Sequence, residues 1–137
     1  MSLNDIPYKK YLDEFYSLYT SRPILDNEGG MKSPHLFATF CFLKTFKPKL
    51  IIESGVWKGL GTWMMRHAVP NARILSFDVD FSNLIFRDPT VKYTQSDITN
   101  MAEAKVNLKD NNKAGYETQA EMDLLKQQDR ENSKDCS

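Results

Sequence analysis

Apolar residues recur along the first hundred positions at two spacings, one typical of amphipathic helices and one typical of short buried strands. The elements that these spacings predict are, in chain order, a helix over Asp5–Thr20, a helix over Ser33–Phe46, a strand over Leu50–Glu53, a helix over Leu60–Ala68, a strand over Arg73–Asp78 and a strand over Val91–Gln95. Ser33 followed by Pro34 is a helix start signal, with serine as the cap and proline at the first helical position. Strands that alternate with helices indicate an α/β fold with a parallel sheet.

The apolar density of the chain falls after the third predicted strand. Of the 16 aromatic residues, all except Tyr116 lie at or before Tyr93. The later part carries only a weak helical pattern, over about residues 116–131. We therefore predict N-terminal helices and a cofactor-binding α/β half-domain over residues 1–100, followed by a polar segment over residues 101–137 that is helical or partly disordered.

A glycine-rich turn follows the first predicted strand. The strand ends in Glu53, and Gly55, Gly59 and Gly61 follow within a span of seven positions. Gly55 allows a sharp turn off the strand, and Gly59 and Gly61 allow the backbone to come close to a ligand or to the sheet. The free amide groups of the next helix point at whatever binds there. A strand, a tight turn and a helix start in this order predict a site for a nucleotide-type ligand. The earlier loop over residues 25–32, with two adjacent glycines, either folds over such a ligand or is a plain connector.

An acid also ends the second predicted strand. Asp78 lies 25 positions after Glu53. In nucleotide-binding α/β sheets a carboxylate at this place accepts hydrogen bonds from both ribose hydroxyls, so Asp78 is the strongest single candidate for a binding residue. Asp80 completes an Asp-x-Asp pair, which also occurs around metal-bound sugar nucleotides in some glycosyltransferases but arises often by chance.

The segment Glu53-x-Gly55-x-x-x-Gly59-x-Gly61-Thr62 resembles the first motif of class I S-adenosylmethionine-dependent methyltransferases. The form of the motif is the one seen in O-methyltransferase-like and cephalosporin-hydroxylase-like families. Those families bind the methionine part of S-adenosylmethionine along this loop and its ribose at the acidic end of the next strand. The resemblance therefore implies S-adenosylmethionine as the cofactor, bound by the residues of the motif and by the acid that ends the second strand.

The resemblance extends over roughly Gly29–Thr99. Asp97 stands where the family places an acid that reads the adenine amino group, although a helix cap requires the same residue type. Trp57, inside the turn, either walls the cofactor site or caps the sheet. The implied fold is a partial Rossmann-like methyltransferase sheet, with parallel strands in the order 3-2-1 and helices on both faces, apparently truncated after the third strand.

Methyl transfer requires an acceptor held in line with the methyl group, and the family supplies that positioning with loops from later strands. We therefore expect a chain that binds the cofactor but is incomplete as a catalyst for an unidentified acceptor. No catalytic residue is identified, because His35 and His67 have simpler roles at helix ends.

Two other functions stay open at this point. Ser54–Gly61, Asp97–Thr99 and Asn111–Gly115 each resemble motifs of the short-chain dehydrogenases, which bind NAD(P). The Tyr-x-x-x-Lys pair of that family does not occur in the sequence, however. The other alternative is a non-catalytic binding or assembly domain, suggested by the missing half of the methyltransferase sheet.

Charge and composition narrow the expected partners. Basic and acidic residues each number 18, so no net field attracts nucleic acid or a membrane surface. No apolar run approaches the ~20 residues that a membrane-spanning helix needs. The N-terminus lacks the pattern of a signal peptide. The two cysteines, Cys41 and Cys136, do not form a disulfide framework. We expect a cytoplasmic protein without a metal. The free edge of the Leu50–Glu53 strand is expected to pair with another copy, or to be covered by the C-terminal segment or by a partner chain.

Overall fold

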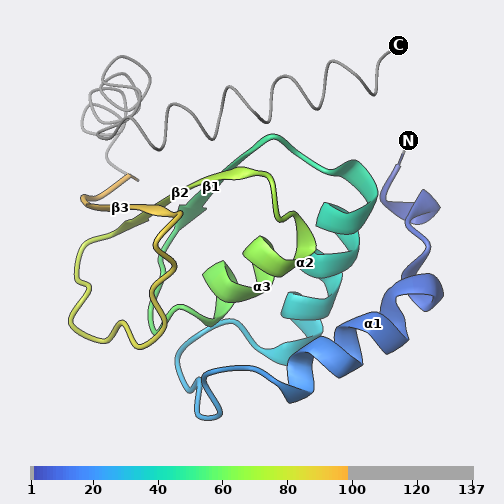
Figure 1. The fold of residues 1–137 in the computed structure, drawn as a ribbon, viewed down its shortest axis with the longest axis horizontal. Coiled ribbons are helices and arrows are strands. Elements are labelled where there is room, and N and C mark those ends of the chain that lie inside the picture. The colour runs from blue at the N-terminus through green and yellow to red at the C-terminus, as the bar shows by residue number, and fades with distance from the viewer. Residues whose placement is uncertain (1, 99–137) are drawn as a thin grey trace. The chain divides into compact units, whose positions relative to one another are not determined.

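The computed structural model describes residues 2–98, which contain one short 3-10 helix (η1), three α-helices and three strands (Figure 1). The elements are η1 (Leu3–Asp5), α1 (Tyr8–Thr20), α2 (Ser33–Phe46), β1 (Leu50–Ser54), α3 (Leu60–Ala68), β2 (Arg73–Asp78) and β3 (Lys92–Gln95). Contacts divide the chain into two units, Met1–Ser96 and Asp97–Ser137, and all of these elements belong to the first.

The three strands form one parallel sheet in the order β1-β2-β3. The α/β class and the predicted order of neighbouring strands are therefore confirmed. The register pairs Glu53 with Ser76 and Asp78 with Gln95. Because parallel strands point the same way, the acids at the carboxyl ends of β1 and β2 meet at the same end of the sheet.

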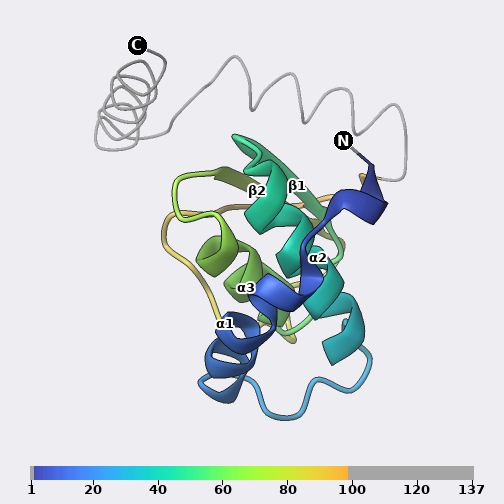
Figure 2. The ribbon, with the colours of Figure 1, turned by 90° about the vertical axis from the view of Figure 1, so that its right-hand side faces the viewer.

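The described helices pack against one face of the sheet. Ile51 and Ile74 belong to one buried cluster with residues of α1, α2 and α3, whereas Leu75 and Phe77, on the opposite face of β2, lie outside this cluster. α2 packs against both α1 and α3, and the two ribbon views show these helices on the same side of the sheet (Figures 1 and 2). The prediction of helices on both faces is not met within residues 2–98, because the connection between β2 and β3 contains no helix.

Aromatic side chains hold α1 against α2. The ring of Phe15 lies 5.2 Å from that of Phe37 and 5.5 Å from that of Phe40, and Tyr11 meets Phe40 edge-on at 6.4 Å. Pairs with such geometry contribute about 0.5–1.5 kcal/mol each beyond the area that they bury. Cys41 is fully buried beside them, and burial raises the pKa of its thiol, so it is a residue of the core.

A buried ion pair holds the connection between β2 and β3 against α3. Arg66 Nε lies 3.5 Å from Asp88 Oδ2, and Arg66 Nη1 donates hydrogen bonds to the carbonyl groups of Pro70 and Ala72. Asp88 Oδ1 accepts from the backbone N–H and from the hydroxyl of Thr90. The ion pair with Asp88 thus ties the connection to α3, and the bonds between Asp88 and Thr90 lie within the connection itself.

Two helix starts differ from the sequence prediction. Ser33 is the first residue of α2 rather than its cap, since Lys32 occupies the cap position with an extended backbone. α1 begins at Tyr8 rather than at Asp5, because η1 forms a separate turn and Pro7 directly precedes the helix.

The predicted helix over residues 116–131 lies outside the described residues. The helices described between residues 2 and 98 are all too short or too polar to cross a membrane.

Candidate functional site

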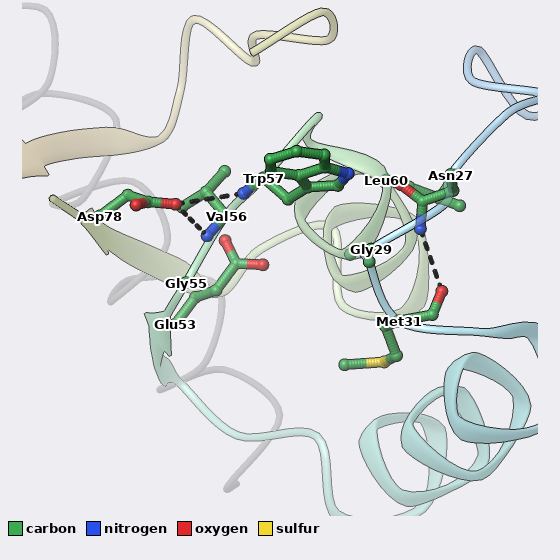
Figure 3. Close-up of a pocket in the computed structure, with 11 residues that line it drawn as sticks. Asn27, Gly29, Met31, Glu53, Gly55, Val56, Trp57, Leu60 and Asp78 are labelled. Carbon is green, nitrogen blue, oxygen red and sulfur yellow. Dashed lines mark hydrogen bonds between the residues drawn. The ribbon is translucent and has the colours of Figure 1, made fainter. Parts of the chain in front are cut away.

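A cavity of about 310 Å³ opens at the carboxyl ends of β1 and β2 (Figure 3). Its lining comes from the loop before α2, from the glycine turn with the residues on either side of it, and from the end of β2. The lining residues are Asn27, Gly29, Gly30, Met31, Glu53, Gly55, Val56, Trp57, Leu60, Gly61 and Asp78. The volume lies at the lower end of the range of about 300–1,000 Å³ that small-molecule sites occupy. Five residues predicted for the site, Glu53, Gly55, Trp57, Gly61 and Asp78, thus meet at one cavity.

The turn after β1 follows a backbone path that glycine adopts most easily. Gly55 has a φ of +86° and Gly59 a φ of +100°, and between them Trp57 also takes a positive φ of 55°. The Gly55 N–H donates a hydrogen bond of 2.8 Å to the carbonyl of Phe77, which continues the pairing of β1 with β2. A Cβ atom on Gly55 would meet nothing within 4 Å, so conformation rather than space requires this glycine.

Glu53 is the more buried of the two acids in the cavity, with 9% of its surface exposed. Its Oε1 accepts hydrogen bonds from the hydroxyls of Thr62, at 2.5 Å, and Ser76, at 2.7 Å. Its Oε2 lies 3.1 Å from the position that a Cβ on Gly61 would take, so this glycine leaves the oxygen open to the cavity. Burial raises the pKa of Glu53, the two hydroxyls lower it, and Asp78 raises it further; the resulting pKa lies above its ordinary value.

Asp78 binds the glycine turn directly (Figure 3). Its Oδ2 accepts from the backbone N–H groups of Val56, at 2.8 Å, and Trp57, at 3.2 Å, and its Oδ1 accepts from that of Asp80, at 3.2 Å. Partial burial raises the pKa of Asp78, but these amide bonds outweigh it and hold the pKa below its ordinary value. The carboxylate of Asp78 therefore holds the glycine turn in place. The sequence predicts that the same carboxylate binds a ribose, and that contact stays a prediction.

Two further predicted residues support the cavity without lining it. A Cβ on Gly59 would clash with the carbonyl oxygen of Phe86, so this glycine admits a neighbouring loop rather than a ligand. The Lys58 carbonyl accepts hydrogen bonds of 3.0 Å from the N–H groups of Ile85 and Phe86. Thr62 is fully buried and acts through its hydroxyl on Glu53. In the described structure Gly59 and Thr62 position the neighbouring loop and Glu53, and the predicted contact of either residue with a cofactor stays a prediction.

Trp57 forms one wall of the cavity and joins the turn to the loop before α2 (Figure 3). Its indole N–H donates a hydrogen bond of 2.9 Å to the carbonyl of Glu28, and its ring lies 3.4 Å from the position of a Cβ on Gly29. Next to it, Lys58 Nζ donates to the carbonyl of Asp26 at 2.6 Å. Of the two roles considered for Trp57, the structure favours the wall of the site.

The cavity carries negative charge and no positive side chain among its described lining residues. Glu53 and Asp78 are the acids in that lining, and it contains no lysine, arginine or histidine. Lys58, the nearest base along the chain, is turned toward Asp26 instead. Such a cavity is complementary to a ligand that brings positive charge or hydrogen-bond donors.

His35, His67 and Asp80, side chains able to act as a general base, do not line the cavity. His35 and His67 are exposed and do not line the cavity, and the His67 ring packs on Trp63 at 5.0 Å. Asp80 accepts hydrogen bonds from the N–H and the hydroxyl of Ser82, at 2.8 and 2.9 Å. In the part of the chain that the structure describes, no three His, Cys, Asp or Glu side chains gather in a way that could hold a metal ion.

The loop over residues 25–32, for which the sequence left open a place over the ligand or a plain connection, lines the cavity with Asn27 and Met31 although neither was singled out. Asn27 Nδ2 closes this loop by donating to the Met31 carbonyl at 3.0 Å. The adjacent glycines of the loop were its one signal. Ser76, which holds Glu53, was also missed, although a small polar residue inside an apolar strand could have indicated it.

Comparison with protein-family models, with curated protein sequences and with solved structures found no match for this chain. The resemblance to methyltransferases therefore rests on the residues of the motif. The predicted role of Asp97 in reading adenine also stays a prediction, since Asp97 is the first residue of the second unit.

Proposed function

We propose that this cavity binds S-adenosylmethionine and that the chain is a methyltransferase-like protein. The observation that carries the proposal is the meeting of Glu53, Asp78 and the glycine turn around one cavity at the ends of adjacent parallel strands. S-adenosylmethionine presents an ammonium group, a sulfonium group and two ribose hydroxyls, together with one carboxylate. A cavity with carboxylate acceptors and no cation favours the ammonium, the sulfonium and the hydroxyls, and requires the carboxylate of the ligand to lie away from Glu53 and Asp78.

The apolar part of the lining suits the same ligand. Trp57 provides an aromatic face, on which a base ring can stack, and Met31 provides a polarisable thioether. The Met31 side chain lies across the cavity from the two acids (Figure 3). The cavity thus combines an acidic side with an apolar side, as an adenosyl amino acid requires.

The same charges disfavour NAD(P), the alternative cofactor. A dinucleotide places its pyrophosphate on the free amides of a glycine turn and of a helix N-terminus. Here the amides of Val56 and Trp57 already donate to Asp78, and Glu53 lies beside the start of α3. A pyrophosphate would therefore approach two carboxylates, and a sugar nucleotide would meet the same obstacle.

The proposed reaction is methyl transfer to an acceptor, which we infer to be a small molecule. The described lining holds no histidine or lysine to take a proton, so the rate would depend on how the acceptor is positioned. We therefore expect cofactor binding without appreciable turnover by this chain alone. Its function would then be to hold the cofactor, either for a partner chain or as a non-catalytic binding domain.

Isothermal titration calorimetry of the whole chain tests this proposal. We expect S-adenosylmethionine to bind with one-to-one stoichiometry and NAD⁺ to give no heat of binding. Gly61→Val, which fills the space in front of Glu53, should weaken the binding at least about tenfold, a loss of 1.4 kcal/mol. The control is Leu25→Ala, a change at an exposed residue outside the lining. Binding of NAD⁺ in place of S-adenosylmethionine would overturn the proposal.

A further inference from the structure

The two acids of the cavity are held differently. All the described bonds of Glu53 go to Oε1, from two hydroxyls, and Oε2 accepts no hydrogen bond within residues 2–98. The residue is nine-tenths buried, and the missing side chain of Gly61 opens Oε2 to the cavity. Figure 3 shows the Glu53 carboxylate directed into the space between Trp57 and Met31.

Asp78 has little acceptor capacity left by comparison. Its two oxygens accept three backbone N–H groups, two of them from the glycine turn. These amide dipoles balance its negative charge, which is why its pKa lies below the ordinary value. Glu53 is therefore the acid whose charge is left for a ligand to neutralise.

No cation of the described lining competes for that charge. A positive group placed in a partly desolvated cavity interacts with a carboxylate more strongly than it does in water. A ligand that carries one more positive charge should then bind more tightly than a neutral ligand of the same shape. S-adenosylmethionine and S-adenosylhomocysteine form such a pair, since they differ by one methyl group and by the charge on sulfur.

We propose that Glu53 is a specificity-determining residue that makes the cavity prefer the sulfonium form of the cofactor over the uncharged thioether product. This inference rests on the proposed function, because it takes S-adenosylmethionine as the ligand. Its consequence is that the chain holds S-adenosylmethionine more tightly than the thioether that remains once a partner chain has completed methyl transfer.

The test is to measure the dissociation constants of both ligands by calorimetry at pH 7.5 for three forms of the chain: wild type, Glu53→Gln and Glu28→Gln. Glutamine keeps the acceptor for Thr62 and Ser76 and removes the charge that faces the cavity. Glu28 is an exposed acid next to the site whose side chain does not line it, so it serves as the matched control. We expect wild type and Glu28→Gln to bind S-adenosylmethionine about tenfold more tightly than S-adenosylhomocysteine, and Glu53→Gln to bind the two within about threefold of each other.

The outcomes separate the two proposals. If both ligands bind to wild type with equal affinity, or if the thioether binds more tightly, the charge preference is wrong and the proposed function stands. If Glu53→Gln keeps the tenfold preference, Glu53 is not its source. If neither ligand binds to wild type, the proposed function fails and this inference fails with it. The wild-type ratio decides the first point even if Glu53→Gln does not fold.

Discussion

The carbonyl oxygen of Phe86 occupies the space in which a Cβ atom of Gly59 would lie. The N–H of the same residue donates to the carbonyl of Lys58, so the connection between β2 and β3 is bonded to the glycine turn. The side chain of Lys58 donates a hydrogen bond to the Asp26 carbonyl, which belongs to the loop before α2. The turn that carries the cavity is thus held between two loops that are distant from it in sequence.

Gly59→Ala should destabilise the chain much more than Gly55→Ala. The alanine methyl would clash with the Phe86 backbone and would keep a φ of +100°, so we expect a loss of about 2–4 kcal/mol in the free energy of unfolding. At Gly55 the space is open and the cost is the positive φ alone, about 1–2 kcal/mol. Urea denaturation followed by circular dichroism measures both. Equal losses for the two variants would show that Phe86 does not constrain the turn.

Asp78→Ala should loosen the glycine turn, because it leaves the amides of Val56 and Trp57 without their acceptor. We expect a loss of about 1–3 kcal/mol in the free energy of unfolding, with a smaller loss for Asp78→Asn, which retains one acceptor oxygen. The control Asp80→Ala removes only an exposed local turn. The pKa of Asp78 is lower in the folded chain than in the unfolded chain, where it is about 3.9. The contribution of Asp78 to the free energy of unfolding is therefore fully present above the unfolded pKa and is lost as the pH falls through the folded pKa. A variant Asp78→Ala as stable as Asp80→Ala would contradict this role.

The pH dependence contributed by Glu53 has the opposite sign. Its pKa is raised in the folded chain, so its stabilising contribution is present below the unfolded pKa of about 4.3 and is lost as the pH rises through the folded value. Glu53→Gln removes this loss, and we expect the variant to melt at a higher temperature than wild type at pH 7 and at a similar temperature near pH 4. Thermal melts across this range provide the measurement. Parallel pH profiles for the two proteins would mean that burial of Glu53 carries no cost.

The outer edge of β1 should mediate self-association. β1 is the first strand of the sheet order, none of the described strands pairs with its other side, and Leu50 and Ile52 are each 45% exposed. We expect sedimentation equilibrium to show a mass that rises with concentration, and Ile52→Lys to return the chain to a monomer. Leu25→Lys, at a residue 78% exposed in a loop, is the control and should not change the mass. A monomeric wild type at all concentrations would show that the edge is not a docking surface for a second copy.

Much of the scaffold is predictable from the sequence, because local patterns determine it. The bounds of α3 and β2 agree with the apolar periodicity, and the acids Glu53 and Asp78 meet as parallel strand ends must. The partners of Gly59 and Asp78 were not predictable, because they depend on how distant loops pack. The sequence predicts that Gly59 approaches a ligand or the sheet, and only the folded chain shows that the Phe86 carbonyl lies against it.

The two tryptophans allow the most direct test of the central claim, that the cavity binds S-adenosylmethionine. Trp57 walls the cavity and its indole N–H donates to the Glu28 carbonyl. Trp63, a residue of α3, is 7% exposed in the core and does not line the cavity. In a ¹⁵N-correlated spectrum of the whole chain, titration with S-adenosylmethionine should shift the indole signal of Trp57 and the amide signals of Gly55 and Gly61, and should leave the Trp63 indole unchanged. Absence of any shift at saturating ligand, or shifts confined to signals away from the cavity, would contradict the claim.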